Sequence, residues 1–108
     1  MTQKKMSPAV SHKEDLDRRL KNSKFAAEFL KASFLDFEGD DHSSFLLALQ
    51  DVIRAHGLAS VAKGAGVSRD ALYKAMRKGG NPTVATLVAV LRELDLQLTI
   101  EPLKRKQG

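Results

Sequence analysis

The sequence predicts an all-α protein of five to six helices with one short β-strand near its C-terminus. Through most of the chain, apolar residues recur three or four positions apart, which is the pattern of helices with one buried face. Asn, Ser, Thr and Gly, the residues that favour helix ends, stand between these segments. Apolar and polar residues alternate only near the C-terminus, as in a half-buried strand.

Length and composition limit the class of protein. The 108 residues have room for one domain, and a hydrophobic content of 43% argues against wholesale disorder. The absence of cysteine excludes disulfides, thiolate metal sites and cysteine catalysis. No apolar run is long enough to cross a bilayer, and the first residues carry no signal core, so we expect a soluble, cytoplasmic protein.

The positive charge of the chain is local. The net charge is +5, but residues 1–50 carry eight basic and eight acidic side chains, which cancel. Residues 51–108 carry ten basic side chains against five acidic ones. Between Lys63 and Lys78 there are five basic residues and a single acid, Asp70. This distribution predicts an anionic partner for the C-terminal half.

The periodicity divides the chain into segments of different kinds. We expect a mobile tail (1–11), N-terminal helices (12–56), a helix-turn-helix (58–78), a packing helix (83–94), a strand (96–101) and a basic tail (103–108), the parts from 12 to 102 forming one domain. Asn22 or Ser23 should cap the second helix, and Ser43 or Ser44 the third. Gly57 should end the third helix.

Two short helices with a tight turn are predicted at residues 59–64 and 69–78. Gly66 stands where the turn requires a positive φ angle, which glycine adopts at little cost. Val67 should fill the angle between the helices, and Ser68 should cap the second one. Two helices joined in this way, the second of them basic, are typical of proteins that bind DNA in the major groove.

The second helix of this pair has one apolar and one polar face. Leu72 and Met76, four residues apart, should face the core. Arg69 can donate two hydrogen bonds to guanine, and Asp70 can accept one from cytosine. The predicted DNA-contacting residues are Ser68, Arg69, Asp70, Tyr73, Lys74, Arg77, Lys78 and Asn81. The alternative is a solvated helical hairpin, which the ordered series of turn glycine, Ser cap and apolar face disfavours.

These residues resemble a known family. The segment 61–73, followed by Gly80-Asn-Pro-Thr83, is similar to the Cro/C1-type (Xre-type) helix-turn-helix. With segments 13–21, 25–30 and 45–51, the chain more narrowly resembles the addiction module antidote proteins, the HigA-like antitoxins, over roughly residues 13–102.

The resemblance implies an antitoxin that neutralises a RelE/ParE-type (HigB-like) toxin and represses its own operon by binding operator DNA. Two alternatives stay open: a free-standing Cro/C1-like regulator without a toxin, and a helical protein-interaction module. The resemblance implies no enzymatic activity.

The alternating segment near the C-terminus predicts a homodimer. Leu96, Leu98 and Ile100 would form one face of a strand, yet no second strand pattern exists in the chain. A second copy across a two-fold axis is the simplest partner, and these three residues are the predicted dimer interface. There are two alternatives: the segment packs as an irregular tail on the core of its own chain, or it forms a strand that pairs with the toxin.

No residues indicate a cofactor, a metal site or catalysis. His12, His42 and His56 are isolated and lack the spacing of metal ligands. The sequence His42-Ser43-Ser44 is more typical of a helix start than of a nucleophile. The phenylalanines can be either core or a toxin-docking surface; they are Phe25, Phe29, Phe34, Phe37 and Phe45.

Overall fold

A computed structural model describes residues 8–35 and 42–104, and in these ranges the chain is helical with irregular connections. The six helices are α1 (Pro8–Leu20), α2 (Ser23–Leu35), α3 (Ser43–His56), α4 (Leu58–Ala65), α5 (Arg69–Met76) and α6 (Val84–Glu93). The expected all-α class is thereby confirmed. Phe37 with the rest of residues 36–41, most of the predicted N-terminal tail and the last residues of the basic tail lie outside the described residues.

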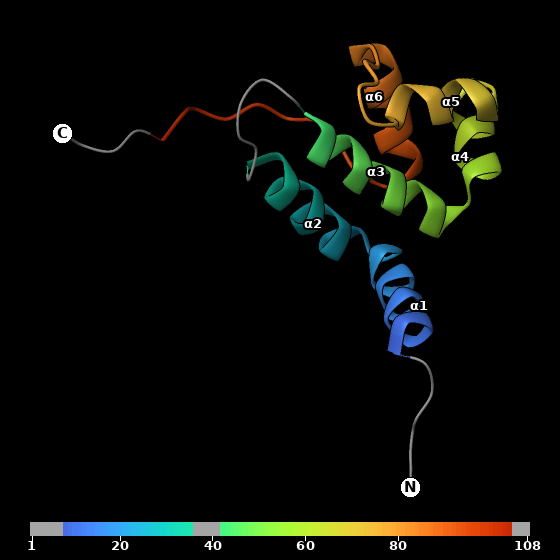
Figure 1. Cartoon of the computed structure of the whole chain (residues 1–108). Helices are drawn as coiled ribbons and strands as arrows, with labels where there is room; N and C mark the ends of the chain where they lie inside the picture. Colours follow the sequence, from blue (N-terminus) through green and yellow to red (C-terminus); the bar gives the residue numbers. More distant parts are fainter. Residues whose placement is uncertain (1–7, 36–41, 105–108) are drawn as a thin grey trace, which may run out of the picture.

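Helix α3 is the centre of the molecule. Helices α1 and α2 pack along one side of it, and α4 and α5 pack on the other side, while α6 packs on α4 (Figure 1). The core is entirely apolar in the described residues, and its largest fully buried side chains are Leu20, Leu49, Val52, Leu72, Met76, Val90 and Leu94. No described helix is by itself long and apolar enough to cross a membrane; α3 and α4 pass that test only as a pair, bent by 102°.

The first helix begins earlier than predicted. It starts at Pro8, whereas the sequence predicts a mobile tail as far as residue 11. Proline suits the first position of a helix, because its φ angle is already helical and the missing N–H would have no partner there. The pair Leu16 and Leu20 packs toward the core as the spacing predicts, with Leu20 fully buried.

One predicted helix cap is correct and another is wrong. The side chain of Asn22 accepts a hydrogen bond from the N–H of Phe25 at 3.0 Å, so Asn22 caps α2. Helix α3 starts at Ser43, and the residue before it is His42, whose side chain makes no capping hydrogen bond. Neither Ser43 nor Ser44 is therefore the cap. The residue before α3 packs against α2 instead: the ring of His42 stacks on that of Phe34, with the ring centroids 5.7 Å apart.

The predicted strand near the C-terminus is absent from the described residues. Residues 96–104 are irregular, and Asp95, two residues after the end of α6, has a φ of 62°. The N–H of Leu96 donates to the carbonyl of Leu91 at 2.8 Å, and that of Asp95 to Arg92 at 3.0 Å. These are the two bonds of a Schellman turn, which brings Leu96 against the core of its own chain. Leu96 is therefore half-buried inside the monomer, while Leu98 and Ile100 remain exposed.

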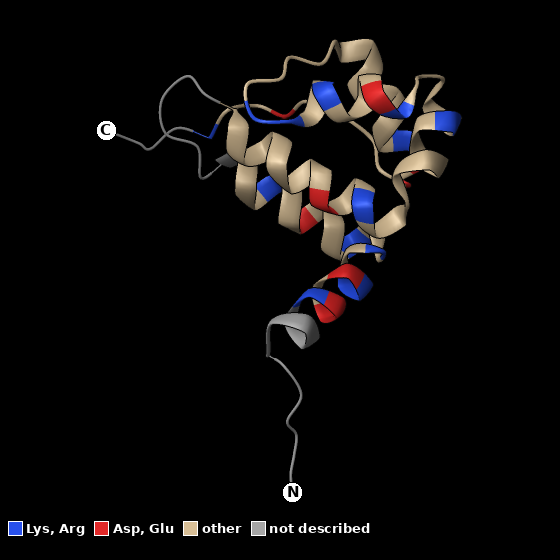
Figure 2. Cartoon of the chain, turned by 45° about the vertical axis from the view of Figure 1, so that its right-hand side comes forward, with Lys and Arg blue, Asp and Glu red and all other residues tan. Residues whose placement is uncertain are grey.

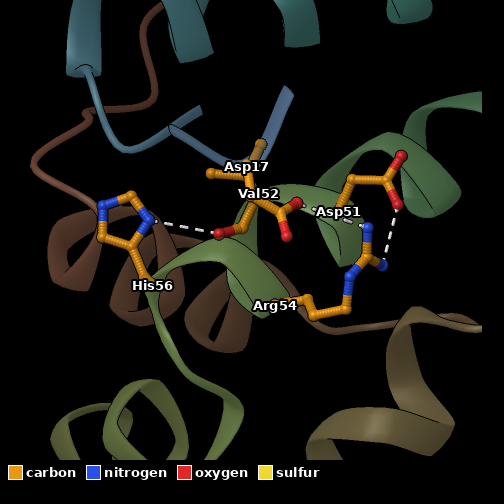
Figure 3. A network of polar contacts seen from close by, with 5 residues as sticks. All are labelled: Asp17, Asp51, Val52, Arg54 and His56. Atoms are coloured by element: carbon orange, nitrogen blue, oxygen red, sulfur yellow. Dashed lines mark hydrogen bonds and ion pairs between the residues drawn. The ribbon is translucent and has the colours of Figure 1, made fainter. Parts of the chain in front are cut away.

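One ion pair joins two helices. Arg54 on α3 lies between Asp51 of the same helix, at 3.0 Å, and Asp17 of α1, at 3.8 Å (Figure 3). The Oδ1 atom of Asp17 is buried and has no hydrogen-bond partner in the described residues, so Arg54 is the nearest source of compensation. The carbonyl of Val52 contacts Nδ1 of His56 at 3.1 Å on the same helix.

We expect Arg54→Ala to lower the free energy of unfolding by about 1 kcal/mol, because it leaves a buried carboxylate oxygen without compensation. Arg18→Ala is the matched control, since Arg18 is 75% exposed and its partner Asp15 lies on the same helix. Urea denaturation of both variants measures the difference. Equal losses of a few tenths of a kcal/mol would mean that the contact between α1 and α3 contributes nothing.

Candidate nucleic-acid interface

Helices α4 and α5 meet at a turn of three residues. Gly66 has a φ of 78°, as the sequence predicts, and its N–H donates to the carbonyl of Lys63 at 3.2 Å. The N–H of Val67 reaches back to the carbonyl of Ala62 at 3.0 Å. This is again a Schellman turn, and it directs Val67 onto the core between the two helices. The turn therefore sets the angle at which α5 leaves α4.

The start of α5 is capped by Ser68. Its Oγ accepts a hydrogen bond from the N–H of Ala71 at 3.0 Å, which confirms the predicted cap. The helix ends at Met76, two residues before the predicted end, because the chain turns sharply at Gly79 and Gly80. A side chain at Gly80 would overlap the carbonyl oxygen of Ala75, so this close approach requires glycine.

One face of α5 is buried and the other is open. Leu72 and Met76 are 1% and 0% exposed, in agreement with the predicted core face. All eight residues predicted to contact DNA lie on the surface, and the structure gathers them along α5 and the turn after it: Ser68, Arg69, Asp70, Tyr73, Lys74, Arg77, Lys78 and Asn81. Tyr73 is 53% exposed, so its ring and hydroxyl are open to a partner on this face.

Positive charge dominates this end of the molecule. Figure 2 shows acidic and basic residues mixed along α1, whereas basic residues predominate around α5. Asp70 and Lys74 form an ion pair at 3.1 Å. The sequence interpretation treated these two as separate contacts and missed the pair, although their spacing of four residues along a helix was a usable signal.

The helix that follows completes the surface. Thr83 caps α6, its Oγ1 accepting from the N–H of Thr86 at 3.1 Å. Val84 in the first turn is 68% exposed, so the start of α6 is open to solvent beside the turn that carries Asn81. Free N–H groups at a helix start attract anions such as phosphate.

The arrangement can bind a polyanion. It presents an exposed basic helix held by buried residues, with hydroxyl, amide and N–H donors at both ends of that helix. These are the groups that contact phosphates and base edges in complexes of helices with DNA. No cluster of three or more potential metal ligands occurs in the described part of the chain.

The aromatic residues of the N-terminal half lie on α2 and α3, and α2 makes no contact with α5 in the described residues. Phe25 and Phe29 are half-buried and stacked, with ring centroids 6.3 Å apart. Phe34 is 49% exposed, and the ring of Phe45 meets it edge-on at 5.2 Å. The group is therefore partly core and partly surface.

Comparison with known proteins gives the family. A family model described as probable addiction module antidote protein matches residues 11–102. An uncharacterized protein of Haemophilus influenzae is 42% identical over 62 residues, which are 57% of this chain and 64% of that relative. The match thus spans just under two thirds of the relative's length. No solved structure matches the chain. The family model covers most of the chain, which therefore belongs to the family of probable addiction module antidote proteins.

Proposed function

We propose that this chain is the antitoxin of a type II toxin–antitoxin module and that it represses its own operon. It binds a RelE/ParE-type (HigB-like) toxin through its N-terminal half and operator DNA through α5, in the manner of a Cro/C1-type (Xre-type) protein. Both activities belong to the cytoplasm. Membership of the antidote family supports the first activity. The exposed basic face of α5 supports the second and carries the proposal.

We propose a separate role for each of several residues of this face. The start of α5 enters the major groove, where Arg69 donates to guanine. Tyr73, Arg77 and Lys78 bind the phosphate backbone on either side, and Asn81 adds an amide donor. Because phosphate contacts carry no sequence information, Arg77→Ala should weaken binding to all DNA alike, whereas Arg69→Ala should relax specificity at one base pair.

The N-terminal half is proposed for the toxin because DNA binding does not need it. Helices α1 and α2 lie on the other side of α3 from α5 and make no contact with α5 in the described residues, so both partners can bind together (Figure 1). The acidic and basic residues of positions 1–50 balance, eight of each, which leaves apolar contacts such as the exposed ring of Phe34 as the attractive feature.

Two experiments separate the two activities. In a gel shift with the chain's own upstream region, we expect sequence-specific binding that weakens steeply with salt. Lack of any shift at low salt would contradict repression.

A second experiment looks for a RelE/ParE-like reading frame beside the gene and co-expresses it with this chain, which should restore growth, and the two proteins should co-purify. A toxic neighbour that is neither bound nor neutralised would leave a free-standing regulator as the function.

A further inference from the structure

Asp70 is the one acidic residue between Asp51 and Glu93 in the sequence, and it lies on the proposed DNA face. Its side chain is 75% exposed, and its Oδ2 atom lies 3.1 Å from Nζ of Lys74, one turn further along α5. An exposed carboxylate on this face repels phosphates and weakens binding to DNA of any sequence. The presence of an acidic residue at position 70 therefore requires an explanation.

Helix stability is a weak reason. The first turn of α5 is already capped by Ser68, which accepts the hydrogen bond of the Ala71 N–H. A carboxylate near a helix start and an exposed ion pair four residues apart each stabilise a helix only slightly. A neutral residue at position 70 would remove the repulsion of phosphates at a small loss of stability.

The ion pair has a second effect, which is to occupy Lys74. The other basic side chains around this face make no ion pair within the described residues; they are Lys63, Arg69, Arg77 and Lys78. These four cations are thus available to DNA, and Lys74 is held by Asp70. Lys74 can therefore contact DNA only if the carboxylate of Asp70 gains another partner or tolerates sharing Lys74 with the DNA.

We propose that Asp70 and Lys74 together read one C·G base pair of the operator, an inference that rests on the proposed DNA binding. In the major groove such a pair presents the N4 amino donor of cytosine next to the O6 and N7 acceptors of guanine. The carboxylate of Asp70 accepts from the amino group, and the ammonium of Lys74 donates to O6 or N7. The carboxylate of Asp70 and the ammonium of Lys74 lie 3.1 Å apart on one helix face, so together they match the adjacent donor and acceptor of the base pair.

On DNA of another sequence the same pair lowers affinity. Where guanine or thymine takes the place of the cytosine, the carboxylate meets base acceptors and no amino group, and it repels the phosphates while Lys74 stays bound to it. Specificity therefore comes in part from weakening the binding of wrong sequences.

The test uses the full chain and three kinds of duplex: one selected by the wild type from a random library, the same duplex with single C·G pairs exchanged, and a shuffled duplex. Asp70→Ala should bind the shuffled duplex several-fold more tightly, with a salt slope steeper by about 0.9 because Lys74 gains a phosphate. The loss of affinity on exchanging one C·G pair should shrink by roughly 10-fold. The double variant Asp70→Ala/Lys74→Ala should return the salt slope to that of the wild type.

Glu28→Gln is the matched control, because it removes one exposed negative charge from α2. If it reproduces the changes seen with Asp70→Ala, net charge alone is responsible and the proposal is overturned. The proposal also fails if Asp70→Ala keeps the full preference at every C·G pair. If the wild type binds all three duplexes equally, or binds none of them, the proposed sequence-specific binding to operator DNA is itself wrong. This outcome differs from a failure of the Asp70–Lys74 proposal alone.

Discussion

Replacing Leu72 by alanine should lower the free energy of unfolding by about 2–5 kcal/mol. Leu72 is 1% exposed and lies where α5 packs against α3 and α4, so its loss leaves a cavity under the proposed DNA-binding helix. A domain of this size has a total stability of about 5–15 kcal/mol, so the variant should be partly unfolded on moderate heating. Urea and thermal denaturation followed by circular dichroism measure both quantities.

Tyr73→Ala is the matched control, because Tyr73 is the next residue along α5 and is 53% exposed. We expect its stability to change by no more than about 0.5 kcal/mol. At low temperature, where the Leu72→Ala variant is folded, the affinity of this variant for DNA should be little changed, because the outer face of α5 is intact. A loss of stability as small as that of the control would mean that α5 is not anchored by Leu72.

Leu98→Asp should convert a homodimer into monomers and weaken operator binding by about 100-fold or more. The homodimer is our proposal, and its basis is an exposed apolar segment after α6: Leu98 is 52% exposed, Ile100 97% and Leu103 74%. Residues 97–103 make no backbone hydrogen bond within the described chain, so the segment is free to contact a second copy. Two copies related by a two-fold axis would present two α5 helices to the two half-sites of a palindrome.

Thr99→Asp separates this interface from a general effect of charge. Thr99 is exposed and adjacent to Leu98, and the substitution adds the same negative charge. It should leave the oligomeric state unchanged in light scattering at tens of micromolar. A monomeric wild type at that concentration contradicts the dimer, and a Leu98→Asp variant that is still dimeric moves the interface elsewhere.

The helix pair could be predicted because its signals are local. Gly66, Ser68 and the Leu72–Met76 spacing each act within one or two turns of the chain, and the structure shows the positive φ, the cap and the buried face that they predict. The same holds for the cap at Asn22. Local rules of this kind do not depend on which other helices are nearby.

The features that were missed depend on context. Alternation from Leu96 onward was interpreted as a strand, but Asp95 closes a Schellman turn in a conformation usually taken by glycine, and Leu96 joins the core of α6 instead. The contact between Asp17 and Arg54 joins residues on two helices that are far apart in sequence, so no spacing rule could reveal it. The start of α3 was misplaced because His42 precedes it without a capping bond.

The central claim is that the α4–α5 face binds DNA while α1 and α2 are left for the toxin. Amide chemical-shift changes in the ¹⁵N-labelled full chain, titrated with a duplex carrying one selected half-site, test it most directly. We predict that the chemical-shift changes concentrate in residues 66–83. The amide resonances of α1 and α2 should stay where they are in the protein without DNA. Shifts concentrated in α1 and α2, with α5 unchanged, would contradict the account.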